Sequence, residues 1–116
     1  MSIRVERIRK TIKEELSLIF MHKLKDPLFA LVTITDVKLT PDIKLAKIYL
    51  SVFEKDKREA VLEKLDSISK LIRTELAHRI KIKFVPEIVF YIDKTSDYVQ
   101  KIEDLLEQVK KGNAED

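Results

Sequence analysis

The sequence contains no cysteine, one glycine and three prolines in 116 residues. Without cysteine, a disulfide framework and a zinc site built on thiolates are both excluded. The single glycine is Gly112, so no glycine-rich loop can hold phosphate in the manner of a P-loop. The only two histidines, His22 and His78, fall in separate predicted helices. We therefore predict that the protein is not an enzyme, with no catalytic residues, no metal and no cofactor.

Long apolar runs are also missing. No stretch approaches the roughly 20 apolar residues that cross a bilayer. The first residues are charged from Arg4 onward, unlike the apolar core of a signal peptide. With 45% hydrophobic and 37% charged residues, the composition is typical of a folded domain. We expect a cytoplasmic protein with no membrane contact, made of one domain over residues 1–110 and a flexible tail over 111–116.

The net charge of +3 is small, but its distribution is uneven. Residues 1–13 and residues 70–83 each carry five basic residues against one acid, whereas residues 93–116 carry seven acids and four lysines. Two interpretations stay open. An oriented basic surface attracts a polyanion, and abundant Lys and Glu also fit the surface ion pairs of a heat-adapted protein.

Hydrophobic periodicity predicts most of the elements. Apolar residues three and four apart predict a first helix that Ser2 caps and that ends before Asp26-Pro27. Residues 31–53 are rich in β-branched side chains and are interrupted by the turn signal Thr40-Pro41-Asp42, so we predict a β-hairpin. The apolar side chains fall on even positions before Thr35-Asp36 and on odd positions after it, which predicts a bulge or a strand end there.

The second half of the chain predicts helix, strand and helix. One apolar stripe runs through residues 56–80 without glycine or proline, so periodicity alone predicts one long helix. A strand follows at 87–92, and a last helix spans roughly 96–110 with Gly112 as its C-terminal cap. The order is αββα(α)βα, which belongs to the α+β class.

The basic residues are the candidate binding groups. Cationic clusters hold phosphates through charge and counterion release, without reading sequence. A solvated helix face is the alternative, mainly for the first helix. We expect Phe84, Phe90 and Tyr91 to pack in the core rather than to stack on bases. The predicted RNA-binding residues are Arg4, Arg7, Lys10, Lys70, Arg73, Arg79, Lys81 and Lys83.

Two distant blocks carry a family resemblance. These blocks are VTITDVKLTPDIKLAKIYLSV at 32–52 and LIRTELAHRIKIKFVPEIVFYID at 71–93, and KIEDLL at 101–106 agrees with them. Together with Arg4–Ile8 and Asp26-Pro27, they match in order and spacing over about residues 3–109. The chain resembles the bacterial ribosome-binding factor A family.

The resemblance implies a type II KH-like domain of order αββααβα, in which helices back a three-stranded sheet. It further implies a kink between the two KH helices, at Ile68-Ser69-Lys70. The family usually has glycine there, whereas this chain has none, so Ser67, Ser69 and Lys70 are the candidate kink residues.

The resemblance also implies the function. It indicates a non-catalytic factor that binds the free small (30S) ribosomal subunit and its rRNA, assists 5′ processing of 16S rRNA and supports growth in the cold. We expect a monomer, since nothing in the sequence demands a dimer. No small-molecule substrate is expected. A protein-interaction module that docks on ribosomal or other proteins, through the hairpin edge or the last helix, is the alternative.

Overall fold

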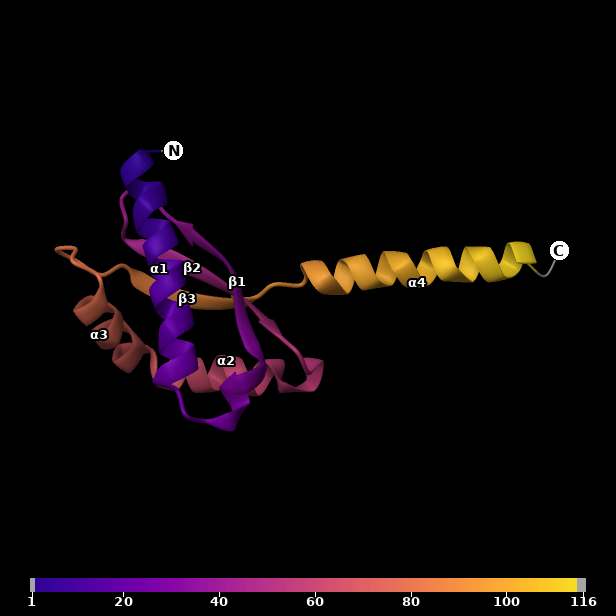
Figure 1. Cartoon of the computed structure of the whole chain (residues 1–116), viewed down its shortest axis with the longest axis horizontal. Coiled ribbons are helices and arrows are strands. Elements are labelled where there is room, and N and C mark those ends of the chain that lie inside the picture. Colours follow the sequence, from indigo (N-terminus) through magenta and orange to yellow (C-terminus); the bar gives the residue numbers. More distant parts are fainter. Residues whose placement is uncertain (1, 115–116) are drawn as a thin grey trace.

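A computed structural model describes residues 2–114 of the chain. Two short 3₁₀ turns, Pro27–Leu31 and Lys55–Lys57, precede the first strand and the second helix. The order confirms the expected α+β class and the sequence αββααβα (Figure 1). The main elements are α1 (Ile3–His22), β1 (Val32–Leu39), β2 (Leu45–Val52), α2 (Arg58–Ser67), α3 (Ser69–Arg79), β3 (Glu87–Ile92) and α4 (Thr95–Ala114).

The strands β1 and β2 form the expected antiparallel hairpin, and β1 carries a bulge. The register shifts between Ile34 and Asp36, which leaves Thr35 without a partner in β2. The extra residue allows Ile34 and Val37, three positions apart, both to be buried. The bulge predicted from the change of parity is confirmed.

The third strand pairs with β2 in parallel. The register runs from Leu45 opposite Glu87 to Leu50 opposite Ile92, and the strand order is β1-β2-β3. A parallel pair requires a long crossover between its strands, and here α2 and α3 form it. Both β1 and β3 are therefore edge strands.

The helices α1, α2 and α3 share one core with the sheet. Ser2 caps α1 as expected, because its hydroxyl accepts a hydrogen bond from the Val5 N–H at 3.1 Å. Burial alternates along β2, so one face of the strand is covered and the other stays partly exposed. The largest side chains with almost no exposed surface include Ile12, Leu16, Ile19, Ile48, Leu50, Leu65, Ile72 and Leu76.

The single helix predicted over residues 56–80 is wrong. The helix is interrupted at Ile68, whose backbone has φ −111° and ψ 16°, so α2 ends at Ser67 and α3 begins at Ser69. The Ser67 hydroxyl donates to the Lys64 carbonyl at 2.7 Å and thereby competes with helix propagation. Periodicity misses this break because Ile68 is half-buried and continues the apolar stripe.

Gly112 does not cap the last helix. α4 continues through it to Ala114, and the backbone of Gly112 does not adopt a positive φ. Residues 111–114 of the expected flexible tail are therefore helical, and residues 115 and 116 lie outside the described part. A helix of 20 residues is about 30 Å long, and α4 projects from the body, giving a longest dimension of 65 Å (Figure 1).

Two aspartates attach α4 to the body. Arg58 of α2 donates to both carboxylate oxygens of Asp97, at 2.7 and 2.8 Å, and Lys55 lies 3.4 Å away. Asp93 accepts the Thr35 hydroxyl at 2.6 Å and the Thr95 N–H at 3.0 Å. Hydrogen bonds from Arg58 lower the pKa of Asp97 to about 2, and those from Thr35 and Thr95 lower the pKa of Asp93 to about 2.

The pairing of Asp97 with Arg58 predicts how the attachment of α4 responds to acid. Because the pKa of Asp97 lies below its ordinary value, the pair with Arg58 stabilises the root of α4 at neutral pH and is lost as the pH falls toward 2. Replacing Arg58→Gln should raise the pKa of Asp97 toward the ordinary value, while that of Asp93 stays near 2. A carboxyl ¹³C titration by NMR measures both values in one sample. An unchanged Asp97 titration in the variant would contradict the assigned cause.

Candidate nucleic-acid interface

Two adjoining hollows meet at Arg73. The first, of 480 Å³, lies between the α2–α3 junction and the edge of β3 and is lined by Lys70, Ser69 and residues 87–90. The second, of 520 Å³, lies between the start of α1, the hairpin turn and the segment that joins α3 to β3. Arg73 and Glu87 line both. We call the two hollows together the Arg73 groove.

Arg73 is held over this groove while its side chain stays exposed. Its Nη2 donates to the Val85 carbonyl at 3.1 Å, which fixes the guanidinium against the segment before β3. A planar guanidinium has five N–H donors, so others remain for a phosphate, which it can bind through two hydrogen bonds. Among the described residues, Arg73 forms no ion pair with a carboxylate.

The lining of the groove is mixed in charge, with a cationic excess. The cations are Arg4, Lys44, Lys70, Arg73 and Lys83, and the carboxylates are Asp42, Asp66 and Glu87. The Asp42 carboxylate is engaged locally, by the Thr40 hydroxyl at 2.7 Å and the Lys44 N–H at 3.1 Å. The hydrogen bond from Thr40 is the main reason that the pKa of Asp42 lies below its ordinary range.

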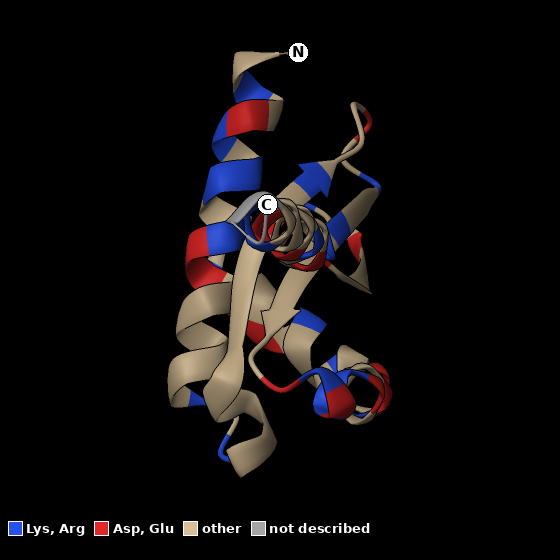
Figure 2. Cartoon of the chain, turned by 90° about the vertical axis from the view of Figure 1, so that its right-hand side faces the viewer, with Lys and Arg blue, Asp and Glu red and all other residues tan. Residues whose placement is uncertain are grey.

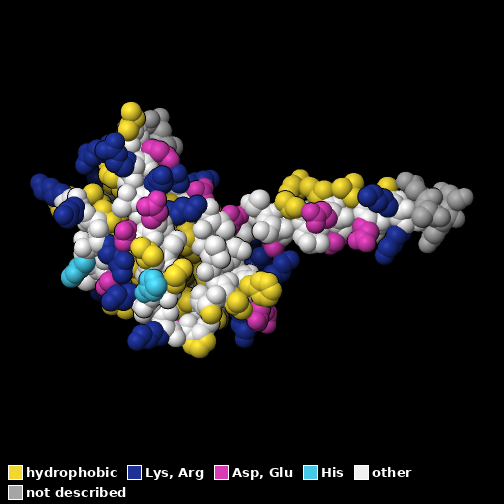
Figure 3. Space-filling model, in the orientation of Figure 1, with side chains coloured by type: hydrophobic (Ala, Val, Ile, Leu, Met, Phe, Trp, Pro, Cys, Tyr) yellow, Lys and Arg dark blue, Asp and Glu magenta, His cyan; other side chains and the backbone are white. Residues whose placement is uncertain are grey.

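The structure divides the predicted residues into groups. Arg4, Lys70, Arg73 and Lys83 line the groove. Lys81 is exposed in the segment between α3 and β3 but does not line either hollow. Figure 3 shows several Lys and Arg side chains at the end of the body remote from α4 and others spread over the rest of this face.

The cations of α1 line different hollows. Arg4 reaches the groove, whereas Arg7 and Lys10 lie beside Ser2, Ile3 and Glu6 in a separate shallow depression. Lys13 extends its ammonium to the Thr35 carbonyl at 3.3 Å, which fastens α1 to the bulge in β1. Figure 2 shows Lys and Arg, interspersed with acids, mainly along the half of α1 nearer the N-terminus.

Arg79 has a structural role that the sequence did not reveal. Its Nη1 lies 3.2 Å from the Glu15 carboxylate of α1, and its Nε lies 3.5 Å from Glu75. The side chain is only 24% exposed. Arg79 therefore joins α3 to α1: its guanidinium is paired with two carboxylates, although its Nε makes no hydrogen bond.

Lys44 and Glu87 line the groove and were absent from the prediction. Lys44 follows the hairpin turn and Glu87 opens β3, and they become neighbours only because the Glu87 N–H donates to the Lys44 carbonyl at 2.9 Å. The pairing of residues 43 positions apart is not visible in local periodicity. The turn before β2 holds Asp42 as well as Lys44, so its charge gives no signal either.

The aromatic side chains depart in part from the expectation that they are core residues. Phe90 is half-buried and packs against Phe20, with ring centroids 6.1 Å apart, as expected. Phe84 is 76% exposed, and Tyr91 is 41% exposed. The prediction is wrong for these two, because Phe84 lies in the irregular segment before β3 and Tyr91 points away from the covered face of the sheet.

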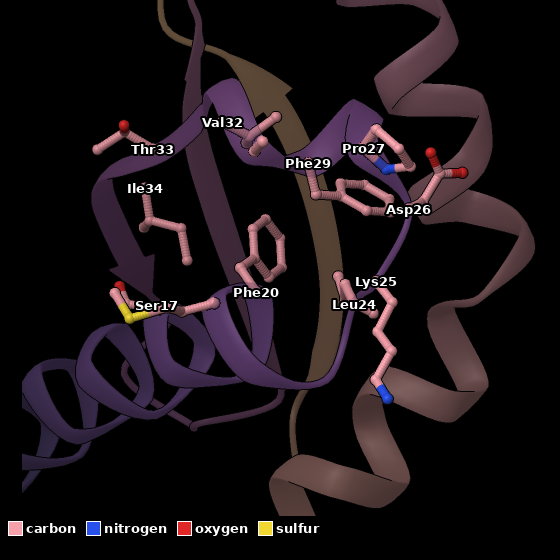
Figure 4. Close-up of a pocket in the computed structure, with 12 residues that line it drawn as sticks. Ser17, Phe20, Leu24, Lys25, Asp26, Pro27, Phe29, Val32, Thr33 and Ile34 are labelled. Atoms are coloured by element: carbon pink, nitrogen blue, oxygen red, sulfur yellow. The ribbon is translucent and has the colours of Figure 1, made fainter.

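A third hollow lies at the other end of α1. It has a volume of 420 Å³ and is formed by the end of α1, the Pro27–Leu31 turn and the start of β1 (Figure 4). Its walls are mainly apolar, and the rings of Phe20 and Phe29 lie 5.9 Å apart within it. Over residues 2–114, no three His, Asp or Glu side chains gather as a metal site would require, and no helix has the length and apolar character of a membrane span.

Comparison with known proteins identifies the family. A family model described as "Ribosome-binding factor A" matches residues 4–106. Ribosome-binding factor A of Thermodesulfovibrio yellowstonii is 36% identical over 112 residues, which cover 97% of this chain and 95% of that protein. The protein of the same name from Brevibacillus brevis is 39% identical over 107 residues, covering 91% and 88%. The chain belongs to the ribosome-binding factor A family.

Solved structures of this family have the same fold. The crystal structure of ribosome-binding factor A from Thermus thermophilus matches with a TM-score of 0.69 at 22% identity, over 78% of this chain and 97% of that one. The solution NMR structure of a putative ribosome-binding factor A from Thermotoga maritima gives 0.69 at 28% identity, over 82% and 92%. A Thermus thermophilus homology model fitted into the cryo-EM map of a 30S complex gives 0.67 at 24% identity, over 77% and 94%. The expected type II KH-like fold is thereby confirmed.

The different positions of Arg73 and Arg79 predict that their substitutions affect the free energy of unfolding differently. Arg79→Ala should lower the free energy of unfolding by about 1 kcal/mol, because Glu15 loses its partner and Glu75 keeps only Lys23, 4.0 Å away. Arg73→Ala should change it by less than about 0.5 kcal/mol, as is usual for an exposed side chain. Urea denaturation followed by circular dichroism measures both. Equal destabilisation by the two substitutions would contradict the division into structural and surface arginines.

Proposed function

We propose that this protein is a non-catalytic assembly factor that binds the free small (30S) ribosomal subunit through rRNA phosphates in the Arg73 groove. Membership of the ribosome-binding factor A family supports the ribosome as the target. The 30S complex into which a Thermus thermophilus relative was fitted supports the small subunit. The protein acts as a cytoplasmic monomer on this proposal.

The observation that carries the proposal is the placement of Arg73 between two cation-lined hollows. RNA presents one negative charge per nucleotide, and lysine and arginine gain affinity for it by releasing its counterions. Lys70 and Lys83 lie on opposite sides of Arg73, one in each hollow. A phosphate backbone that follows the groove therefore meets a cation in each hollow and a guanidinium where they join.

Binding alone is sufficient for a role in maturation. A factor that binds one conformation of rRNA and not its alternatives stabilises that conformation in proportion to its concentration and affinity. We propose that this bias favours the fold of 16S rRNA from which its 5′ end is processed. Growth in the cold depends on the same bias, because misfolded RNA helices rearrange slowly at low temperature.

The groove is tested by reversing its charge. The triple variant Lys70→Glu, Arg73→Glu and Lys83→Glu should reduce affinity for small subunits on the order of a hundredfold in co-sedimentation. A control variant, Lys25→Glu, Lys57→Glu and Lys101→Glu, makes the same change in net charge at exposed residues outside the groove. Equal loss in both variants would show a non-specific charge effect, and full binding by the groove variant would refute the proposed site.

A second function is supported by α4, which exposes an apolar stripe. The stripe extends over three to four turns and is visible along one side of α4 in Figure 3. Side chains on the rest of this helix include three lysines and four acids, so it does not attract phosphates strongly. The exposed apolar residues are Tyr98, Val99, Ile102, Leu105, Leu106 and Val109.

We propose that this stripe docks on a ribosomal protein of the same subunit. An amphipathic helix binds a protein by placing such a face in an apolar groove. The pair of Arg58 with Asp97 holds the root of α4 against α2, so the rest of the helix projects toward a partner. The interaction adds to phosphate binding without competing for the same residues.

Substitutions on the two sides of α4 test the second function. Ile102→Gln with Leu106→Gln should weaken binding to whole subunits roughly tenfold and leave binding to protein-free 16S rRNA unchanged. Lys101→Gln with Glu107→Gln, on the polar side, should leave both unchanged. Far-UV circular dichroism checks that α4 remains helical. Unchanged affinity for whole subunits in the first variant would contradict docking through α4.

A further inference from the structure

The partly exposed face of the sheet carries an ordered stack of side chains. Tyr49 of β2 lies opposite Tyr91 of β3 in the parallel register, and the two rings stack with centroids 5.6 Å apart and an interplanar angle of 25°. The Lys38 ammonium of β1 lies over the Tyr49 ring, 5.2 Å from its centroid. The three side chains come from three successive strands. We call them the tyrosine stack.

The stack is open at one end. Lys38 and Tyr91 come from the strands on either side of Tyr49, so they approach its ring from opposite sides. Tyr91 belongs to the edge strand β3 and is 41% exposed, so no further strand covers its outer side. A flat aromatic group could extend the stack by lying on the outer face of Tyr91.

The charges around the stack favour a polyanion. Lys38 and Lys47 are opposite one another in the β1–β2 register, next to the Tyr49–Tyr91 pair. The nearby carboxylates are engaged: Asp36 lies 3.5 Å from Arg9, and Asp93 accepts the Thr35 hydroxyl at 2.6 Å. Glu87 is four residues from Tyr91 along β3, about 13 Å away.

The stack and the Arg73 groove share the edge strand β3. Residues 87–90 of β3 line the groove, and Tyr91 is the next residue of the same strand. Tyr91 points to the open face of the sheet, so a single strand of RNA would pass from the groove to Tyr91 by crossing the edge of β3.

We propose that the open face of the sheet is a second RNA-binding surface, on which an unpaired base stacks on Tyr91 while Lys38 and Lys47 attract the backbone. This proposal rests on the proposed function, which supplies RNA as the ligand. Aromatic rings bind unpaired bases in this way with little preference among them, because every base has a flat face. The surface therefore selects single-stranded RNA over duplex RNA, without selecting a sequence.

Binding of a short oligonucleotide tests this surface directly. The full chain is titrated into a fluorescently labelled octauridine, and anisotropy gives the affinity. Tyr91→Leu should weaken binding roughly tenfold, the order expected for one lost base–aromatic stack, whereas Tyr91→Phe should bind as the original chain does. Tyr98→Leu, on α4, is the matched control and should have no effect. Binding of a blunt RNA duplex should not respond to Tyr91→Leu.

NMR provides an independent readout because the chain has only three tyrosines. On addition of octauridine, the ring signals of Tyr91 and Tyr49 should shift and those of Tyr98 should not. Absence of octauridine binding, equal binding by Tyr91→Leu and the original chain, or unmoved Tyr91 signals would each overturn the proposal. A different result would show that the Arg73 groove does not bind RNA: Arg73→Glu would then leave binding to the small subunit intact.

Discussion

The parallel pairing of β3 with β2 determines where the Arg73 groove and the tyrosine stack lie. A parallel strand must return to the same end of the sheet as its partner, so the chain needs a long crossover. Here α2 and α3 make that crossover, and the break at Ile68 directs α3 so that Lys70 and Arg73 lie beside the edge of β3. The core on the other side of these helices, with Leu65, Ile72 and Leu76 almost fully buried, fixes that direction. The same pairing brings Glu87 to Lys44 and Tyr91 to Tyr49.

Three surfaces of different chemistry carry the proposals. The Arg73 groove presents cations, the tyrosine stack presents an aromatic face, and α4 presents an apolar stripe; we propose a phosphate backbone, an unpaired base and a protein as their respective partners. The small ribosomal subunit presents all three kinds of partner, and individually weak contacts that engage together bind more strongly than any one of them. The position of α4 depends on Asp93 and Asp97 at its root. Asp93 is held by Thr35 of β1, and Asp97 is held by Arg58 of α2 and by Lys55 in the turn before α2. Contacts made by α4 are thus coupled to the body through a few charged and polar groups.

Much of this fold could be predicted from sequence, where the signals are local. The spacing of Val5, Ile8 and Ile12 gave α1, and the change of parity near Thr35 gave the bulge. Local signals failed where distant residues decide the outcome. The stripe of α2 and α3 is unbroken because Ile68 is apolar, so periodicity could not locate the interruption. Arg79 resembled any other cation, since its partner Glu15 is 64 residues away. The Tyr49–Tyr91 pair was missed for the same reason, because a parallel register between distant strands is a property of the tertiary fold.

The central claim is that rRNA lies in the Arg73 groove and crosses the edge of β3. Ultraviolet crosslinking of the full chain to purified small subunits, with the crosslinked residues located by mass spectrometry, tests it most directly. We predict crosslinks within residues 69–73 and 83–91, on both sides of the groove and at the tyrosine stack. Crosslinks confined to the exposed side of α2 or to α4, with none in those two segments, would contradict the account.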